Sequence, residues 1–313
     1  MTVTMSIATS PPGKKKKYIF TEREKRALRV ARRLLWPGLV VSILLTQIPF
    51  LVTIYYSFQN WNLLRPKDQG FAGIDNYIHV FQSGIFLESV WATVLITGSA
   101  VVFSLVLGLG LALLLDRKFR GVGLARTLLI TPFLVMPAAA VLVFKWSIFE
   151  ANSGLLNWFL SLFGIARLEW TTNLPIWMVI IVLTWQYMPF MMLILLAGLQ
   201  SQSGEVLEAA AVDGAGPFRI FMTMTLPHLR QYVEIAVLLG TIILLGSFDP
   251  IAIMTKGAGG TKTLPYMLYE RAFVGLEVGE AAAYGVLTVI ITIIFASLLL
   301  RTLFRIFSKE GVR

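Results

Sequence analysis

Two short stretches place polar and aromatic side chains inside otherwise uncharged, apolar segments of the chain. They are Trp185, Gln186 and Tyr187 in one segment, and Gly246, Ser247, Phe248 and Asp249 in another. Polar groups inside such segments are costly and therefore mark candidate functional sites. Aromatic rings stack on the C–H faces of a sugar, and amides or hydroxyls pair with its hydroxyl groups. The alternative interpretation is interfacial anchoring for the aromatic residues and hydrogen bonding between helices for Gln186 and Ser247.

The residue inventory argues against several kinds of chemistry. The chain has no cysteine and only two histidines, His79 and His228. This excludes disulfides, thiolate nucleophiles and a His-rich or Cys-ligated metal site, so no catalytic residue and no metal site is predicted. The Gly-rich phosphate loop that ends in Gly-Lys-Ser/Thr is absent from the sequence, so ATP chemistry is not expected on this chain.

The composition is that of a membrane protein. Of the 313 residues, 57% are hydrophobic and 14% are charged, against about 25% charged in soluble domains. A helix needs about 20 apolar residues to cross a bilayer. We expect six such helices, at 35–58, 89–115, 127–144 (extendable to 148), 175–199, 232–254 and 281–300. The predicted fold class is all-α, a polytopic helix bundle in the lipid bilayer.

Basic residues predict the orientation of this bundle. Twenty of the 27 Lys and Arg residues fall in the N-terminal segment, the loops after the second and fourth spans, and the tail. Because positive charge concentrates on the cytoplasmic side, both termini are predicted to be cytoplasmic. The net charge of +10 therefore indicates topology, and no nucleic acid partner is expected. Two charges remain near the outer ends of spans, Lys145 and Asp249, and they either pair or reach separately to water.

The loop between the fourth and fifth spans, residues 201–230, has an unusual pattern. A helix-forming run at 204–212 precedes Gly214, which permits backbone conformations that other residues resist. Pro217 suits the first turn of a second helix. Phe218, Phe221 and Met222 follow as an apolar stripe at helical spacing, and we expect Leu226-Pro227 to end that helix.

An exposed apolar stripe in a loop indicates docking to a partner, the alternative being that it packs on the membrane or on the chain's own helices. Glu208-Ala209-Ala210, then Asp213-Gly214-Ala215, then Leu226-Pro227 resembles the EAA loop of bacterial ABC importer permeases. The resemblance implies a six-helix type I permease fold in the bacterial inner membrane. It also implies a second permease subunit, two copies of an ATP-binding subunit that hold ATP and Mg, and an extracytoplasmic solute-binding protein.

By position in the motif, the resemblance assigns roles within the loop. Glu208 and Asp213 make polar contacts or cap a helix, and Gly214 makes a close turn. Ala209, Ala210 and Ala215 allow tight packing, while Phe218 and Phe221 fill a groove of the ATP-binding subunit. The loop thereby couples that subunit to the membrane helices.

Other stretches resemble the carbohydrate, maltose-permease-like branch of this family. They include Phe71, Gly73, Asn76 and Tyr77, and the Gly-rich segment 257–260, although the family's Gly-Gly-Pro lacks its proline here. A sugar or sugar alcohol is the implied solute. The implied organisation is a basic segment 1–34, a first span with its outer loop 35–88, a core 89–304 and a tail 305–313.

Three alternatives remain open at this stage. The solute of such a permease is instead a polyamine, phosphate or amino acid, although charged solutes favour more charged path residues than these spans contain. A secondary transporter is expected to carry intramembrane carboxylates, and only Asp249 approaches that. A membrane enzyme such as a lipid-linked glycosyltransferase lacks an evident acidic cluster or catalytic set.

Overall fold

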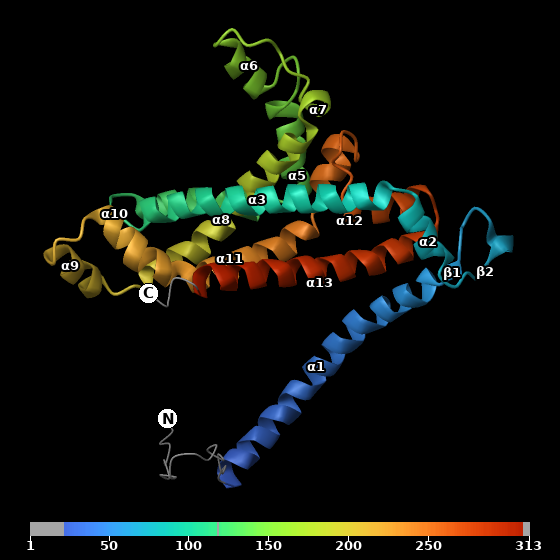
Figure 1. The fold of residues 1–313 in the computed structure, drawn as a ribbon, viewed down its shortest axis with the longest axis horizontal. Helices are drawn as coiled ribbons and strands as arrows, with labels where there is room; N and C mark the ends of the chain where they lie inside the picture. The colour runs from blue at the N-terminus through green and yellow to red at the C-terminus, as the bar shows by residue number, and fades with distance from the viewer. Residues whose placement is uncertain (1–21, 118, 309–313) are drawn as a thin grey trace. The chain divides into compact units, whose positions relative to one another are not determined.

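The computed structural model describes residues 22–117 and 119–308, and these residues are predominantly helical (Figure 1). The α-helices are α1 Glu22–Ser57, α2 Asp75–Gln82, α3 Ile85–Leu115, α4 Val122–Leu134, α5 Pro137–Val143, α6 Leu155–Ser161, α7 Trp170–Asn173, α8 Pro175–Gln200, α9 Gly204–Val212, α10 Pro217–Ile220, α11 Leu226–Leu245, α12 Leu264–Tyr269 and α13 Val278–Ser308. Single π-helical turns occur at η2 Phe144–Ile148, η3 Phe221–Thr225, η4 Ile251–Thr255 and η5 Glu270–Val274. A 3₁₀ turn, η1 Pro66–Asp68, lies between strands β1 Gln59–Asn60 and β2 Gly70–Phe71, which pair antiparallel.

The chain divides into two units, residues 1–52 and 53–313. The described part of the first unit belongs to α1, whose segment Arg32–Ser57 is long and apolar enough to cross a membrane. The N-terminal basic residues before position 22 lie outside the described residues.

The prediction of six apolar spans is confirmed in number if the third span counts as one broken span. Five helices pass a test of length and hydropathy, and α4 with α5–η2 forms a further pair. That pair is bent by 97°, so the span predicted over 127–144 is broken and is not one continuous helix. Pro137 disfavours helical backbone at Met136, and Val135 and Met136 are extended, with ψ of 136° and 127°. The helix therefore ends at Leu134.

The fifth span also differs from its prediction at 232–254. A continuous helical stretch covers Pro217–Leu245, and it stops at Gly246, whose φ and ψ are −84° and 1°. The polar stretch 246–249 consequently follows the helix as a break before η4, instead of lying within a regular span.

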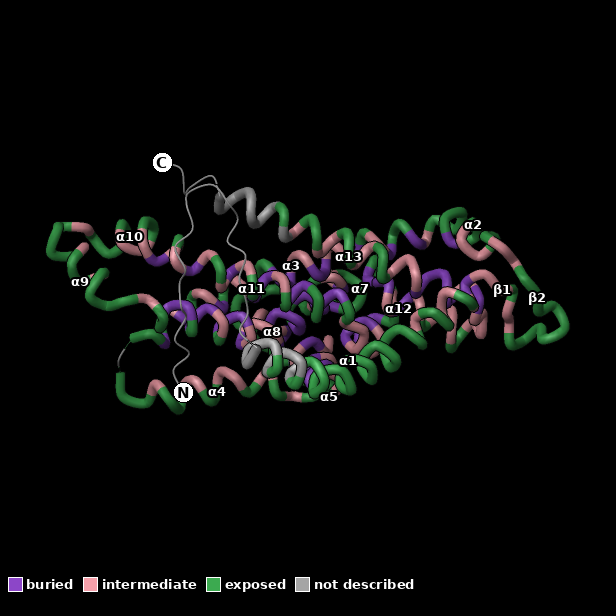
Figure 2. The backbone as a smooth tube through the Cα atoms, turned by 90° about the horizontal axis from the view of Figure 1, so that it is seen from below, coloured by how far each residue is buried: buried purple, intermediate pink, exposed green. Residues whose placement is uncertain are grey.

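The core of the second unit lies where α3, α8 and α11 pack together (Figure 2). Met191, Met192 and Leu195 of α8 are completely buried there. Gly108 of α3 allows the closest approach, because a Cβ added to it would lie 2.9 Å from the backbone nitrogen of Met192. The small residue thus sets the distance between α3 and α8.

The α9–α10 loop and the α2–β1–β2 region lie at opposite ends of this unit (Figure 1). In the latter region, the Asn76 side-chain amide donates to the carbonyl oxygens of Ser57 and Gln59, both at 2.9 Å. The Tyr77 hydroxyl lies 2.7 Å from the Ser57 Oγ. The stretch that resembles sugar permeases in sequence therefore fixes the end of α1 and the strand that follows it.

Candidate functional site: the α9–α10 loop and the broken helices

The loop that carries the EAA-like pattern folds as a helix–turn–helix. Its first helix, α9, has the predicted bounds, and Pro217 begins α10 as predicted. The turn ends α9 with two backbone bonds, from the Gly214 N–H to Ala211 O at 3.1 Å and from the Ala215 N–H to Ala210 O at 3.0 Å. This Schellman arrangement requires a left-handed residue, and Gly214 supplies it with a φ of 85°.

Several large apolar side chains are exposed on this loop. Val212 is 88% exposed and Phe218 is 73% exposed, and Met222 extends the same surface toward α11. Phe221 is half-buried. The remaining predicted loop residues divide into exposed Glu208, Ala209, Asp213 and Pro227 and half-buried Ala210, Ala215 and Leu226. Exposed aromatic and aliphatic side chains at a loop tip mark a surface for a partner.

Glu208 and Asp213 do not cap a helix through their side chains. Ser203 occupies the N-cap position of α9, and Asp213 occupies the C-cap position through its backbone N–H. Among the described residues, no side-chain hydrogen bond or ion pair joins either carboxylate to the rest of the chain. Both acidic groups therefore remain available at the loop surface.

The prediction that Leu226-Pro227 ends the second loop helix is wrong. α10 continues through the π-turn η3 into α11, and Pro227 lies near the start of α11. The Leu226 N–H bonds to Phe221 O, five residues back. A π-turn accommodates the proline because it relieves the requirement for a regular N–H to C=O ladder at that point. α10, η3 and α11 thus form one continuous helical segment, which joins the loop to the fifth span.

Gln186 lies in the middle of α8 and faces the break in the third span. Its side chain is 2% exposed, and its Nε2 donates to the carbonyl oxygen of Val135 at 3.1 Å. That carbonyl lies beyond the last regular turn of α4, so it has lost its place in the helical ladder. The Gln186 Oε1 is buried without a partner within the described part of the chain.

The two predicted polar stretches come together at Tyr187. Its hydroxyl lies within interaction range of the Ser247 side chain and of the Asp249 carboxylate. The Tyr187 ring also packs edge-on against Phe133, with ring centroids 6.1 Å apart. Spans three, four and five therefore contribute to one partly polar region.

The other predicted path residues lie elsewhere. Trp185 packs on Phe144, with ring centroids 5.0 Å apart. Because each residue of a helix turns by about 100° from the one before, Trp185 and Tyr187 point in nearly opposite directions. Trp185 and Tyr187 therefore do not form a single aromatic face. Phe248 stacks on Tyr266 and contacts Tyr269, and Gly246 is an exposed C-cap.

Lys145 does not pair with Asp249. Its ammonium donates to the carbonyl oxygen of Ile253 at 2.6 Å and lies 5.5 Å from the centroid of the Trp146 ring. Lys145 belongs to η2 and Ile253 to η4. Neither contact was predicted. The sequence does not show that Lys145 in η2 and the Ile253 carbonyl in η4 would lie side by side.

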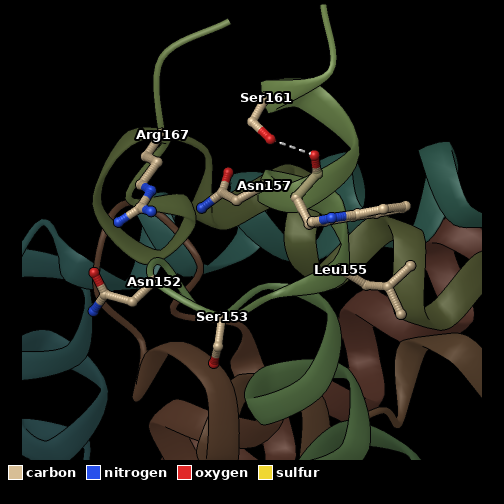
Figure 3. Close-up of a pocket in the computed structure, with 7 residues that line it drawn as sticks. Asn152, Ser153, Leu155, Asn157, Ser161 and Arg167 are labelled. Atoms are coloured by element: carbon tan, nitrogen blue, oxygen red, sulfur yellow. Dashed lines mark hydrogen bonds between the residues drawn. The ribbon is translucent and has the colours of Figure 1, made fainter.

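The segment between η2 and α7, which contains α6, borders an open cavity of about 440 Å³, lined by Asn152, Ser153, Leu155, Asn157, Trp158, Ser161 and Arg167 (Figure 3). Asn157 organises this loop, since its amide donates to Ala151 O and Leu168 O and its oxygen accepts from the Trp170 indole. None of the predicted path residues lines this cavity.

Glu150 stabilises the start of the same loop. Its carboxylate accepts hydrogen bonds from the backbone N–H and hydroxyl of Ser153 and from the backbone N–H of Asn152. These hydrogen bonds lower the pKa of Glu150 below its ordinary value, and the bond from the Ser153 backbone N–H contributes most. Within the described residues, no three His, Asp or Glu side chains gather as a metal site would require.

Three comparisons relate this architecture to known proteins. Residues 100–310 match the family described as the inner membrane component of binding-protein-dependent transport systems. The chain is 35% identical over 257 residues to a sulfoquinovosyl glycerol transport system permease protein, SmoG, of Agrobacterium fabrum, covering 80% of this chain and 83% of the relative. It is 30% identical over 280 residues to a trehalose/maltose transport system permease protein, MalF, of Thermococcus litoralis, covering 88% and 94%.

Among solved structures, a bacterial alginate ABC transporter in complex with its pentasaccharide-bound periplasmic protein contains a similar chain. The TM-score is 0.73 and the identity 19%, and the alignment covers 91% of this chain and 96% of that chain. This similarity shows the fold. The family match covers most of the chain and carries the identification. The chain belongs to the family of inner-membrane permease components of binding-protein-dependent ABC transport systems, and as such it is a transport subunit without a catalytic site of its own.

Proposed function

We propose that this chain forms the membrane path for a sugar or sugar alcohol and is driven by a separate ATP-binding subunit through the α9–α10 loop. The observation that carries the coupling role is the exposed apolar tip of that loop, which includes Val212 and Phe218 and is continuous with α11. A movement of this tip would therefore be transmitted to α11 through the continuous helical stretch Pro217–Leu245.

The solute assignment is supported by the relatives and by the path itself. The two relatives are named for transport of sulfoquinovosyl glycerol and of trehalose and maltose. In this chain, the Tyr187 phenol lies near the Ser247 hydroxyl and the Asp249 carboxylate and packs on the Phe133 ring, and the Gln186 amide lies next along α8, beside the break in the third span. Neutral donors and acceptors beside rings suit a polyhydroxylated solute better than an ionic one.

We further propose the assembly that this role requires. The chain would pair with a second permease subunit, two copies of an ATP-binding subunit would hold ATP and Mg on the cytoplasmic side, and an extracytoplasmic solute-binding protein would deliver the solute. Both termini would be cytoplasmic, as supported by the asymmetric distribution of Lys and Arg. Closure of the ATP-binding subunits would rock the helices between inward-open and outward-open states.

Cross-linking tests the coupling role. Because the chain has no cysteine, a single Val212→Cys variant can carry a photoactivatable cross-linker at the loop tip. We expect it to capture the co-purifying ATP-binding subunit, whereas the same probe at Trp158, in the loop that follows η2, is expected not to. Equal capture from both positions, or no co-purifying ATP-binding subunit, would contradict the proposal.

Solute binding tests the proposal that the solute is a sugar or sugar alcohol. The cognate solute-binding protein should be stabilised against heat by a disaccharide, a glycoside or a sugar alcohol from a panel that also contains amino acids, polyamines and phosphate. Stabilisation by one of the latter compounds alone would assign the permease to a non-sugar solute and leave the coupling role intact.

A further inference from the structure

A hydrogen-bonded cluster joins the two ends of the α9–α10 loop. Ser201 is the C-cap of α8, just before α9, and His228 lies just after the π-turn η3, in the first turn of α11. The Ser201 Oγ lies 2.9 Å from the His228 Nε2 and accepts from the Tyr232 hydroxyl at 2.8 Å. Ser201 also donates to Gly198 O at 2.7 Å.

The hydrogen bonds of this cluster are mutually consistent only with a hydrogen on the His228 Nε2. The single hydroxyl hydrogen of Ser201 is used toward Gly198 O, and Tyr232 donates its own hydrogen to the Ser201 Oγ. The His228 Nε2 faces both the Ser201 Oγ and, at 3.2 Å, the Gly198 O. Both of these oxygens are left as acceptors, so the Nε2 must be the donor.

Close packing holds the same groups in place. A Cβ added to Gly198 would lie 2.6 Å from the Tyr232 ring, so the glycine lets that ring approach α8. The Leu229 side chain, fully buried, lies against the same position. The cluster is therefore a contact between the cytoplasmic ends of α8 and α11 that combines packing with directional hydrogen bonds.

We propose that Ser201, His228 and Tyr232 form a joint that makes α8 follow the movement of the α9–α10 loop. α11 is already continuous with α10, whereas α8 reaches α9 only through the short link at residues 201–203. Without the joint, that link is a hinge, and only the packing between α8 and α11 transmits a push on the loop to α8. With the joint, the push also reaches α8 directly, which carries Gln186 and Tyr187, while α11 leads into the stretch that contains Ser247. This inference rests on the proposed coupling role of the loop, and these three are positioning residues.

The test uses the full complex in nanodiscs with ATP and vanadate as the probe. A fluorophore on Asn173→Cys, an exposed position immediately before α8, reports movement at the far end of that helix. We compare His228→Phe, which keeps a ring but removes the donor, with His228→Gln, whose side-chain N–H replaces that of Nε2. Tyr232→Phe keeps the ring that packs on Gly198 and removes only the hydroxyl.

Loss of this hydrogen-bond donor is expected to lower the ATP-dependent fluorescence change about fivefold in His228→Phe, with ATP hydrolysis close to the wild-type rate. His228→Gln should retain the change, and Tyr232→Phe should show part of the loss. An undiminished change in His228→Phe and Tyr232→Phe, or equal losses in His228→Phe and His228→Gln, would overturn the joint. Failure of any ATP-binding subunit to co-purify with the unaltered chain would instead overturn the proposed function.

Discussion

The Gln186 side chain donates a hydrogen bond to the carbonyl oxygen of Val135 at 3.1 Å, and this bond joins the middle of α8 to the break between α4 and α5. A carbonyl that leaves a helical ladder inside an apolar region must find another donor. Gln186 supplies it, and its Oε1 is buried without a partner among the described residues. The same amide therefore stabilises the broken span.

We predict that Gln186→Leu lowers solute uptake about tenfold, because it removes the side-chain donor from the part-buried Val135 carbonyl, at a cost of about 1–3 kcal/mol. Uptake in proteoliposomes of the complete transporter is the measurement. Thr184→Val is the matched control, because the Thr184 hydroxyl is buried on the same helix without a partner among the described residues. Equal effects of the two substitutions would refute the role of the Gln186 bond.

We predict that Gly214→Val uncouples ATP hydrolysis from uptake. The space around Gly214 is open, so the cost is conformational and comes from the φ of 85°, a region that β-branched residues avoid. Gly214→Asn should retain most coupling, since asparagine tolerates this conformation. Gly216→Val, at a glycine with a φ of −69° and equally open surroundings, should transport normally. Normal uptake by Gly214→Val vesicles would sink the prediction.

Phe218→Ser is expected to weaken retention of the ATP-binding subunit. Burying a phenylalanine side chain in a partner's groove is worth about 1.5–3 kcal/mol, so the dissociation constant should rise at least about tenfold. Binding of the purified ATP-binding subunit to the reconstituted permease measures this directly. Thr223→Ala, on the same helical stretch with a hydroxyl that bonds only to its own helix at Arg219 O, should leave the affinity unchanged.

Much of the fold could be predicted from the sequence, because long uncharged runs leave a membrane chain few choices besides helices. The bounds of α9 and the positive φ at Gly214 likewise follow from local rules about helix formers and glycine. The apolar character of the loop tip was visible in the residue spacing alone. These features depend on near neighbours along the chain, so one sequence contains the information.

The predictions about helix ends and about the partners of polar groups failed at π-turns and at helix breaks. Pro227 has no backbone N–H, and the π-turn η3 just before it accommodates this loss. The helix therefore continues where a proline was predicted to end it. Before Pro137 the chain bends, and the hydrogen bond that stabilises the bend joins Val135 to Gln186, 51 positions further along the chain. Lys145 similarly finds the Ile253 carbonyl instead of a carboxylate. Such partners are set by packing between distant segments, which periodicity and spacing do not encode.

The loop that begins at Glu150 should lose local stability in acid. Because the Ser153 and Asn152 bonds lower the pKa of Glu150 in the folded state, their contribution is present above the unfolded value of about 4.3 and is lost as pH falls through the lower folded value. Hydrogen exchange of the Asn152 and Ser153 amides, corrected for intrinsic rates, should accelerate over that range. In Glu150→Gln the protection should be weaker and independent of pH, and a pH-dependent loss in that variant would contradict the assignment.

Two glycines on α3 offer a direct test of how α3 and α8 pack. Gly108→Ala should lower the melting temperature of the chain in detergent, because the new Cβ would lie 2.9 Å from the Met192 nitrogen and 3.1 Å from the Met188 carbonyl oxygen. Backbone atoms cannot rotate away, so the helices must separate, at a cost of about 1–3 kcal/mol. Gly110→Ala, two residues further along with open surroundings, should be neutral or stabilising by up to about 1 kcal/mol, because alanine favours the helix. Equal melting temperatures for the two variants would show that Gly108 does not set the separation of α3 and α8.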